Sequence, residues 1–132
     1  VSFFGSVSTL DQAISIVEQV GDTEATLIVD AFHTWNSDSH PELLSTLPGH
    51  RISHYHIDDA APGIPAGEQT DPDRVMIGDG VIDLEAEIAM LRTIGYQGMI
   101  SLELFNRQLW QQDPAEVLGI GIERLRELVG HA

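Results

Sequence analysis

The sequence contains no cysteine, and its six basic residues are all arginines, so lysine is absent as well. The lack of cysteine excludes disulfide bonds and thiolate chemistry but leaves the compartment open, with the cytoplasm as the default expectation. No apolar run approaches the roughly 20 residues of a membrane-spanning helix, and no signal-peptide pattern opens the chain. Because the chain opens on Val1 instead of methionine, we do not expect Val1 to begin the native gene product.

Positive charge is scarce, with 21 acidic residues against 6 basic ones and a formal net charge of −15. Such a surface repels a phosphate backbone, so we expect no general nucleic-acid binding. The length of 132 residues and the 42% hydrophobic content are those of one globular domain with a real core. We therefore expect a single domain over residues 1–132 and no membrane partner.

Hydrophobic patterning and capping residues predict alternating strands and helices. Thr9 and Gln12 have capping-box spacing, Asp83 can cap a later helix, and Asp113 followed by Pro114 predicts the start of the last one. The expected strands cover residues 1–5, 25–32, 52–58 and 98–105; the expected helices cover 9–20, a short stretch from Pro41, 83–94 and 113–129. Residues 58–82, rich in Asp, Pro and Gly, predict a long loop that is functional or disordered.

A strand followed by a helix, four times over, predicts an α/β fold with a parallel sheet and right-handed crossovers. Four βα units amount to half of an eight-stranded barrel. A flat, four-stranded, doubly wound sheet is the competing architecture.

Polar residues collect where the predicted strands end. Asp30 and His33 follow one strand, His56 and Asp58 end the next, and Glu103 lies in the last. Ligands of α/β folds bind at this edge of the sheet, and mixed histidine and carboxylate ligands suit Mn²⁺, Co²⁺, Zn²⁺ or Mg²⁺. We therefore expect a divalent-metal site there, with Asp58 positioning its neighbours or anchoring the following loop.

Each of these residues also has an ordinary structural interpretation. A single carboxylate after a strand is more often a helix cap or a solvated loop residue. Glu103 is harder to explain in that way, because its apolar neighbours in "SLELF" leave a carboxylate in need of a cation or several donors. His54 shares a strand face with His56 and is expected to be packed and hydrogen-bonded. The "GDG" at 78–80 lacks the context of a dinucleotide fingerprint, and no G-x-S-x-G elbow is present.

Four segments together resemble the C-terminal half of the xylose-isomerase-like sugar isomerase/epimerase family: "IVDAFHTW", "HYHIDDA", "TDPDRVMIGDGVIDL" and "ISLELFNRQLW". The resemblance covers the chain from about residue 9 to its end. It implies four βα units of a (β/α)₈ TIM barrel. It also implies metal-dependent isomerisation or epimerisation of a sugar or keto-inositol through an enediolate.

The resemblance further assigns individual residues. It implies metal ligands at Asp30, His56 and Glu103, and catalytic roles for Glu103 and His33. The substrate contacts that it implies are His33, Arg74, Trp35 and Phe105.

Two features depart from the family pattern. The strand that "VSFFG" resembles carries a metal-binding glutamate in the family, and the equivalent here is Ser2 or a residue before Val1. Ile77 also replaces the proline of the turn after Arg74.

With four βα units missing, we expect a homodimer that relieves the open sheet edges. The alternative is a non-catalytic half-barrel that at most binds metal. Endonuclease IV, a DNA-cutting relative, needs more metal ligands than this chain supplies, and the −15 charge argues against DNA.

Overall fold

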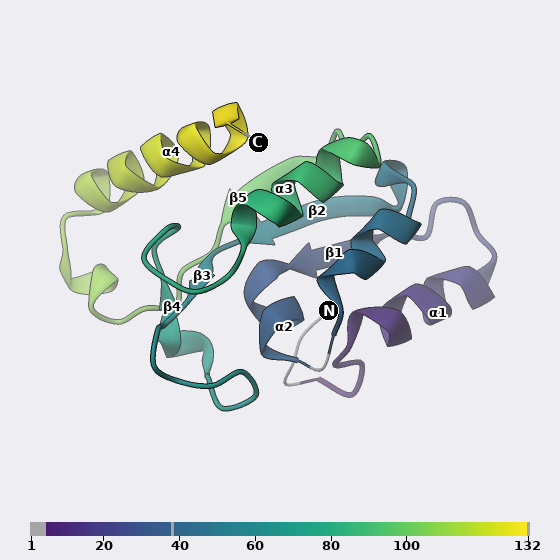
Figure 1. Ribbon diagram of the computed structural model, residues 1–132, viewed down its shortest axis with the longest axis horizontal. Helices are drawn as coiled ribbons and strands as arrows, with labels where there is room; N and C mark the ends of the chain where they lie inside the picture. The colour runs from purple at the N-terminus through teal and green to yellow at the C-terminus, as the bar shows by residue number, and fades with distance from the viewer. Residues whose placement is uncertain (1–4, 38, 132) are drawn as a thin grey trace.

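The computed structural model describes residues 5–37 and 39–131, so the predicted strand over 1–5 and the Ser2 position lie almost entirely outside it. Three parallel strands form the main sheet in the order β1 (Leu27–Asp30), β2 (Ile52–Ile57) and β5 (Met99–Leu102) (Figure 1). Four α-helices accompany them in the described residues: α1 (Leu10–Val20), α2 (Ala31–Asn36), α3 (Leu84–Thr93) and α4 (Pro114–His131). The predicted parallel α/β arrangement is confirmed for this part of the chain.

The helices begin where the sequence places their caps. Thr9 and Gln12 form the capping box of α1, and the Asp83 side chain accepts a hydrogen bond from the Ala86 N–H at the start of α3. Gly21 ends α1 in the left-handed conformation (φ 68°), which glycine adopts without strain. Among the described residues, no helix has both the length and the apolar character that crossing a bilayer requires.

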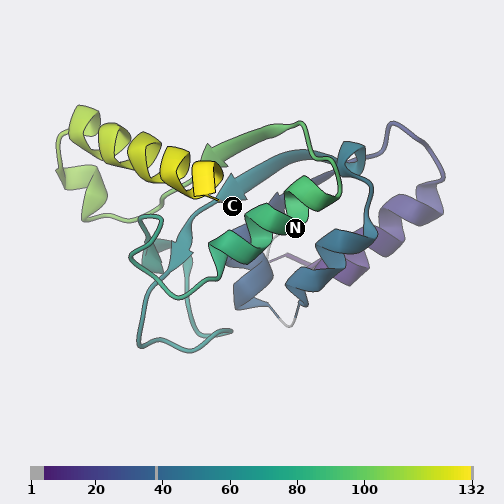
Figure 2. The same cartoon turned by 45° about the horizontal axis from the view of Figure 1, so that its top comes forward.

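One face of the sheet carries the core. Val29 and Tyr55 are neighbours across β1 and β2, both have no exposed surface, and they pack with apolar residues of α1 and α3. Figures 1 and 2 show these two helices on the same side of the sheet. On the opposite face Ile28, His54 and Met99 are register partners, and Ile28 and Met99 are 51% and 65% exposed. A doubly wound sheet covers both faces, so this one-sided arrangement is that of a barrel segment.

Two predicted strands are shorter than expected, whereas the short helix between them begins where predicted. The strand expected over 25–32 stops at Asp30, because the Asp30 side chain accepts the His33 N–H at 2.8 Å and caps α2. The short helix expected from Pro41 is confirmed, and it is a 3₁₀ helix, Pro41–Thr46. The strand expected over 98–105 is β5 alone, which lies at the edge of the described sheet and is only partly buried.

The segment predicted as a long loop is ordered and contains a two-stranded antiparallel ladder, β3 (Asp59–Ala60) with β4 (Arg74–Val75). Gln69, which is 1% exposed, closes the intervening loop by bonding both the N–H and the carbonyl of Ala61. Asn36 of α2 bonds the same loop at Gly67 N and Gln69 O. The loop therefore holds β4 against the carboxyl end of the sheet.

A buried carboxyl group lies within the core at Glu87 of α3, which is 2% exposed and accepts a hydrogen bond from the Tyr55 hydroxyl. Burial raises the pKa of Glu87 to about 7 although the Tyr55 hydrogen bond opposes the rise, and the carboxylates of Asp30, Asp83 and Asp59 add to it. The folded protein therefore holds the Glu87 proton more tightly than the unfolded chain, whose ordinary glutamate pKa is 4.5.

We expect the free energy of unfolding to fall as pH rises from about 4.5 to 7, since the unfolded chain ionises first, with a loss of about 3 kcal/mol from this group. Glu87→Gln is expected to remove this loss and to be the more stable protein above pH 7. Urea unfolding at pH 5 and pH 8 gives the change in unfolding free energy for each protein. The difference between the wild-type change and the Glu87→Gln change is the contribution of Glu87. An equal pH dependence in the two proteins would show that Glu87 titrates normally.

Candidate metal centre

Asp30 ends β1 and begins α2, and both of its carboxylate oxygens have partners. Oδ1 accepts the His33 N–H at 2.8 Å, and Oδ2 accepts Arg74 Nη1 at 2.9 Å. The side chain is almost fully buried, and Thr34 secures the same turn by donating its hydroxyl to the Asp30 carbonyl at 2.8 Å. Asp30 Oδ2 consequently has a fixed position at the carboxyl end of the sheet.

His56 and Glu103 come to the same place from the two neighbouring strands. His56 is the register partner of Asp30, and its Nδ1 lies 3.8 Å from Asp30 Oδ2 and 3.2 Å from Glu103 Oε2. Glu103 follows directly after β5, where its N–H donates to the Ile57 carbonyl at 3.2 Å and extends the ladder by one residue. One ligand atom from each of Asp30, His56 and Glu103 lies within 4.8 Å of the other two.

These three residues, called the triad below, suit a divalent cation. Ligand atoms that share an ion at about 2.0–2.2 Å stand roughly 3–4 Å apart, which the two His56 distances match. One imidazole nitrogen with carboxylate oxygens is a donor set for Zn²⁺, Co²⁺ or Mn²⁺. Three protein ligands leave further coordination positions open for water or substrate.

Arg74 lies behind the triad with no exposed surface. Its Nη1 bonds the carboxylates of Asp30 and Asp58 and lies 3.5 Å from Glu103 Oε2. Its Nε and Nη2 donate to Asp71 Oδ1 at 3.2 and 2.9 Å. Although burial alone lowers the pKa of Arg74, the carboxylates of Asp58 and Asp30 raise it above its usual value, so the guanidinium stays charged.

Asp58 is fully buried and joins two elements of the site. Its Oδ1 accepts the Phe32 N–H of α2 at 3.1 Å, and its Oδ2 accepts from Arg74 Nη1. The expectation that Asp58 anchors the following loop is confirmed, because Arg74 belongs to that loop.

His33 lies on α2 with its Nε2 3.1 Å from Arg74 Nη2. Burial lowers the pKa of His33, with Asp30 opposing the effect, so the imidazole is neutral near pH 7. Since a guanidinium can only donate, Nε2 accepts and the ring proton is assigned to Nδ1. Trp35, on the same helix, is half-buried against the core, and Phe105 is 40% exposed with its ring centroid 5.3 Å from the Arg74 guanidinium carbon.

His54, which is the second histidine of β2, lies outside the triad. Its Nε2 is 2.6 Å from the Ser101 hydroxyl on β5, and its ring centroid is 5.0 Å from that of His56. The expectation of a packed, hydrogen-bonded histidine is confirmed.

Asp59 has a structural role that is not evident from the sequence alone. Its carboxylate accepts four backbone N–H groups, those of Ala60, Gly78, Gly80 and Ile82, at 2.9–3.1 Å. A Cβ at Gly80 would lie 2.3 Å from Asp59 Oδ1, so the turn needs glycine there. An aspartate pair after a strand, followed some twenty residues later by G-x-G, is the available sequence signal.

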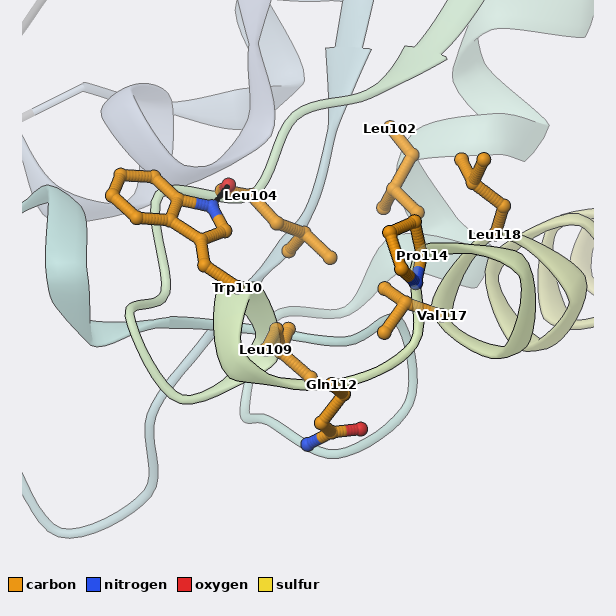
Figure 3. A pocket seen from close by; sticks show the side chains of 8 residues that line it. All are labelled: Leu102, Leu104, Leu109, Trp110, Gln112, Pro114, Val117 and Leu118. Atoms are coloured by element: carbon orange, nitrogen blue, oxygen red, sulfur yellow. Dashed lines mark hydrogen bonds between the residues drawn. The ribbon is translucent and has the colours of Figure 1, made fainter.

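An apolar pocket of about 450 Å³ lies between the end of β5 and the start of α4 (Figure 3). Its apolar walls include Leu102, Leu104, Trp110 and Leu118. Within the described residues β5 pairs with β2 alone, so the pocket borders an open strand edge. No triad residue lines this pocket. The candidate reactive site is therefore placed at the triad, whose residues can hold a metal ion, and not in the pocket.

The sequence matches a known protein family over almost its whole length. The family model described as xylose isomerase-like TIM barrel matches residues 2–128. This chain belongs to that family. The three parallel strands with helices on one side are accordingly part of a TIM barrel.

Individual members of the xylose isomerase-like family are similar to most of this chain. The inosose isomerase of Bacillus velezensis is 36% identical over 124 residues, 94% of this chain and 44% of that protein. The inosose isomerase of Bacillus subtilis is 37% identical over 113 residues, which are 86% of this chain and 40% of that protein. The chain thus spans less than half the length of these curated relatives.

A solved structure is similar to this chain in both fold and sequence. The IolI protein, crystallised with a bound zinc atom, superposes with a TM-score of 0.87 and 35% identity over 93% of this chain and 44% of that one.

Proposed function

We propose that this chain supplies the metal-binding part of an isomerase or epimerase that acts on a sugar or an inosose. The observation that carries the proposal is the convergence of Asp30, His56 and Glu103 at the carboxyl edge of the sheet in a member of this family. Similarity to inosose isomerases and to a zinc-containing structure supports it. A cytoplasmic location stays a prediction.

A divalent ion in the triad would supply a Lewis acid that polarises the substrate carbonyl and makes the neighbouring C–H more acidic. Glu103, whose side chain is 34% exposed, is accessible to the substrate as a base. It would take the proton from that carbon, giving an enediolate, and return it to the neighbouring carbon or the opposite face. His33, Trp35 and Phe105 stay predicted substrate contacts, with His33 also a predicted catalytic residue.

The exposed face of the sheet suggests how copies of this chain would associate. Ile28 and Met99 are exposed there, and in the part of the chain that the structure describes β5 pairs on one side only, beside an apolar pocket. For the 132-residue chain taken by itself, we expect a second copy to cover this surface and form a homodimer. The alternative function is a non-catalytic half-barrel that binds metal at most.

A pair of histidines on one strand tests the function. His56→Asn is expected to weaken Zn²⁺ or Mn²⁺ binding more than about 100-fold and to abolish turnover of inosose and ketohexoses, because it removes the only nitrogen donor of the triad. The measurements are titration of metal-stripped protein with each ion and a substrate assay on the reloaded sample, with light scattering on that sample to give the oligomeric state.

His54→Asn is the matched control, since His54 is on the same face of β2 but bonds Ser101. We expect the His54→Asn variant to bind metal as the wild-type protein does. Metal binding without turnover in the wild-type protein would favour the non-catalytic alternative, and equal loss of metal in both variants would contradict the triad.

A further inference from the structure

Arg74 has no donor left for a substrate. Nη1 is taken by Asp30 and Asp58, Nη2 and Nε by Asp71, and Nη2 also lies 3.1 Å from His33 Nε2. A substrate hydroxyl would have to displace either a carboxylate or the His33 imidazole from a charged, desolvated guanidinium.

Aromatic rings cover the guanidinium as well. Its central carbon lies 4.7 Å from the centroid of Phe32 and 5.3 Å from that of Phe105. Together with the absence of exposed surface, this places the side chain behind the triad and out of reach from the open edge of the sheet.

The contacts of Nη1 show what Arg74 does reach. It is 2.9 Å from Asp30 Oδ2, the oxygen that faces His56, and 3.5 Å from Glu103 Oε2. A rigid guanidinium that contacts two ligand carboxylates fixes the distance between them, which a flexible ammonium on a four-carbon stem does not.

We infer that Arg74 is a positioning residue that sets the geometry of the Asp30 and Glu103 ligand oxygens, and that Asp58 holds Arg74 in place for this task. The inference rests on the proposed metal-dependent function and revises the substrate contact expected at Arg74. Asp58 is suited to the role because it is fully buried and is itself fixed by the Phe32 N–H. Its loss would free the guanidinium to shift away from Asp30.

The chain offers a matched arginine–aspartate pair as a control. Arg124 of α4 bonds Asp79 at 2.6 Å and the Ile77 carbonyl at 2.7 Å, with no triad residue among these partners. Arg74→Lys and Asp58→Asn are therefore compared with Arg124→Lys and Asp79→Asn in the full chain. The readouts are the affinity of metal-stripped protein for Mn²⁺, followed by electron paramagnetic resonance, and the thermal unfolding midpoint.

We expect Arg74→Lys and Asp58→Asn each to weaken Mn²⁺ binding by about 10–100-fold, while the control variants change it less than about 3-fold. If Arg74→Lys shows no cooperative unfolding, Asp58→Asn, which keeps side-chain size, carries the test. Unchanged Mn²⁺ affinity in a folded Arg74 or Asp58 variant would overturn the inference and leave the proposed function standing. A wild-type chain that binds no Mn²⁺ or Zn²⁺ would overturn both.

Discussion

Replacing Glu103 by glutamine is expected to lower kcat by about 10³-fold or more and to leave the fold intact. The amide cannot accept a proton, and general-base catalysis alone is typically worth roughly 10²–10⁴-fold. The substitution also removes one charged oxygen donor of the triad. Because Glu103 lies just past β5 with a third of its side chain exposed, we expect a stability change below about 1 kcal/mol.

Steady-state kinetics on metal-loaded protein, with circular dichroism for the fold, measure this effect. Glu123→Gln on the exposed surface of α4 is a control that makes the same chemical change away from the triad. A Glu103→Gln protein with wild-type turnover would contradict the role of Glu103 as the base.

Replacing Asp59 by alanine is expected to lower the free energy of unfolding by about 3–5 kcal/mol. Hydrogen bonds to a charged group contribute about 1.5–3 kcal/mol each, without simple additivity, and Asp59 accepts four of them while 2% exposed. The backbone N–H groups of Gly78, Gly80 and Ile82 would lose their partner. Because this turn follows directly after β4, we also expect the loop around Arg74 to loosen.

Urea unfolding measures the loss, with Asp79→Ala as the control in the same turn. The Asp79 side chain is 53% exposed, and its ion pair with Arg124 is partly solvated, so its removal is expected to cost at most about 1 kcal/mol. Equal losses in the two variants would show that the Asp59 carboxylate does not organise the turn.

Much of the fold could be predicted because three of the four α-helices in the described residues carry a recognisable start signal. The Thr9–Gln12 box, Asp83 and Pro114 begin α1, α3 and α4 as the sequence indicates. The end of β1 could not be predicted in this way, because the residues on both sides of Asp30 in "IVDAF" are apolar and continue the strand pattern. In the structure the Asp30 side chain caps α2, and the strand ends there. The exposure of β5 depends on which strand lies beside it, which no local pattern records.

In the candidate site, too, some features could be predicted from the sequence and others could not. Asp30, His56 and Glu103 were expected together because parallel strands bring their carboxyl ends to one edge, and the structure brings them within 4.8 Å. The burial of Arg74 could not be expected, because it depends on the two-residue ladder of β3 and β4, which is too short to leave a periodic pattern. The roles assigned to the site residues stay predictions until the variants are measured.

The two oxygens of Asp30 constrain how this position can change in evolution. Oδ1 caps the start of α2, while Oδ2 faces His56 and accepts from Arg74, so a substitution here affects the helix start, the metal ligand and the Arg74 ion pair together. Asparagine or serine would preserve the helix start and give up the anionic ligand, whereas glutamate would keep the charge and lose the short reach that a cap requires. The start of α2 by itself therefore permits asparagine or serine at this position, and it is the metal ligand and the Arg74 ion pair that require aspartate.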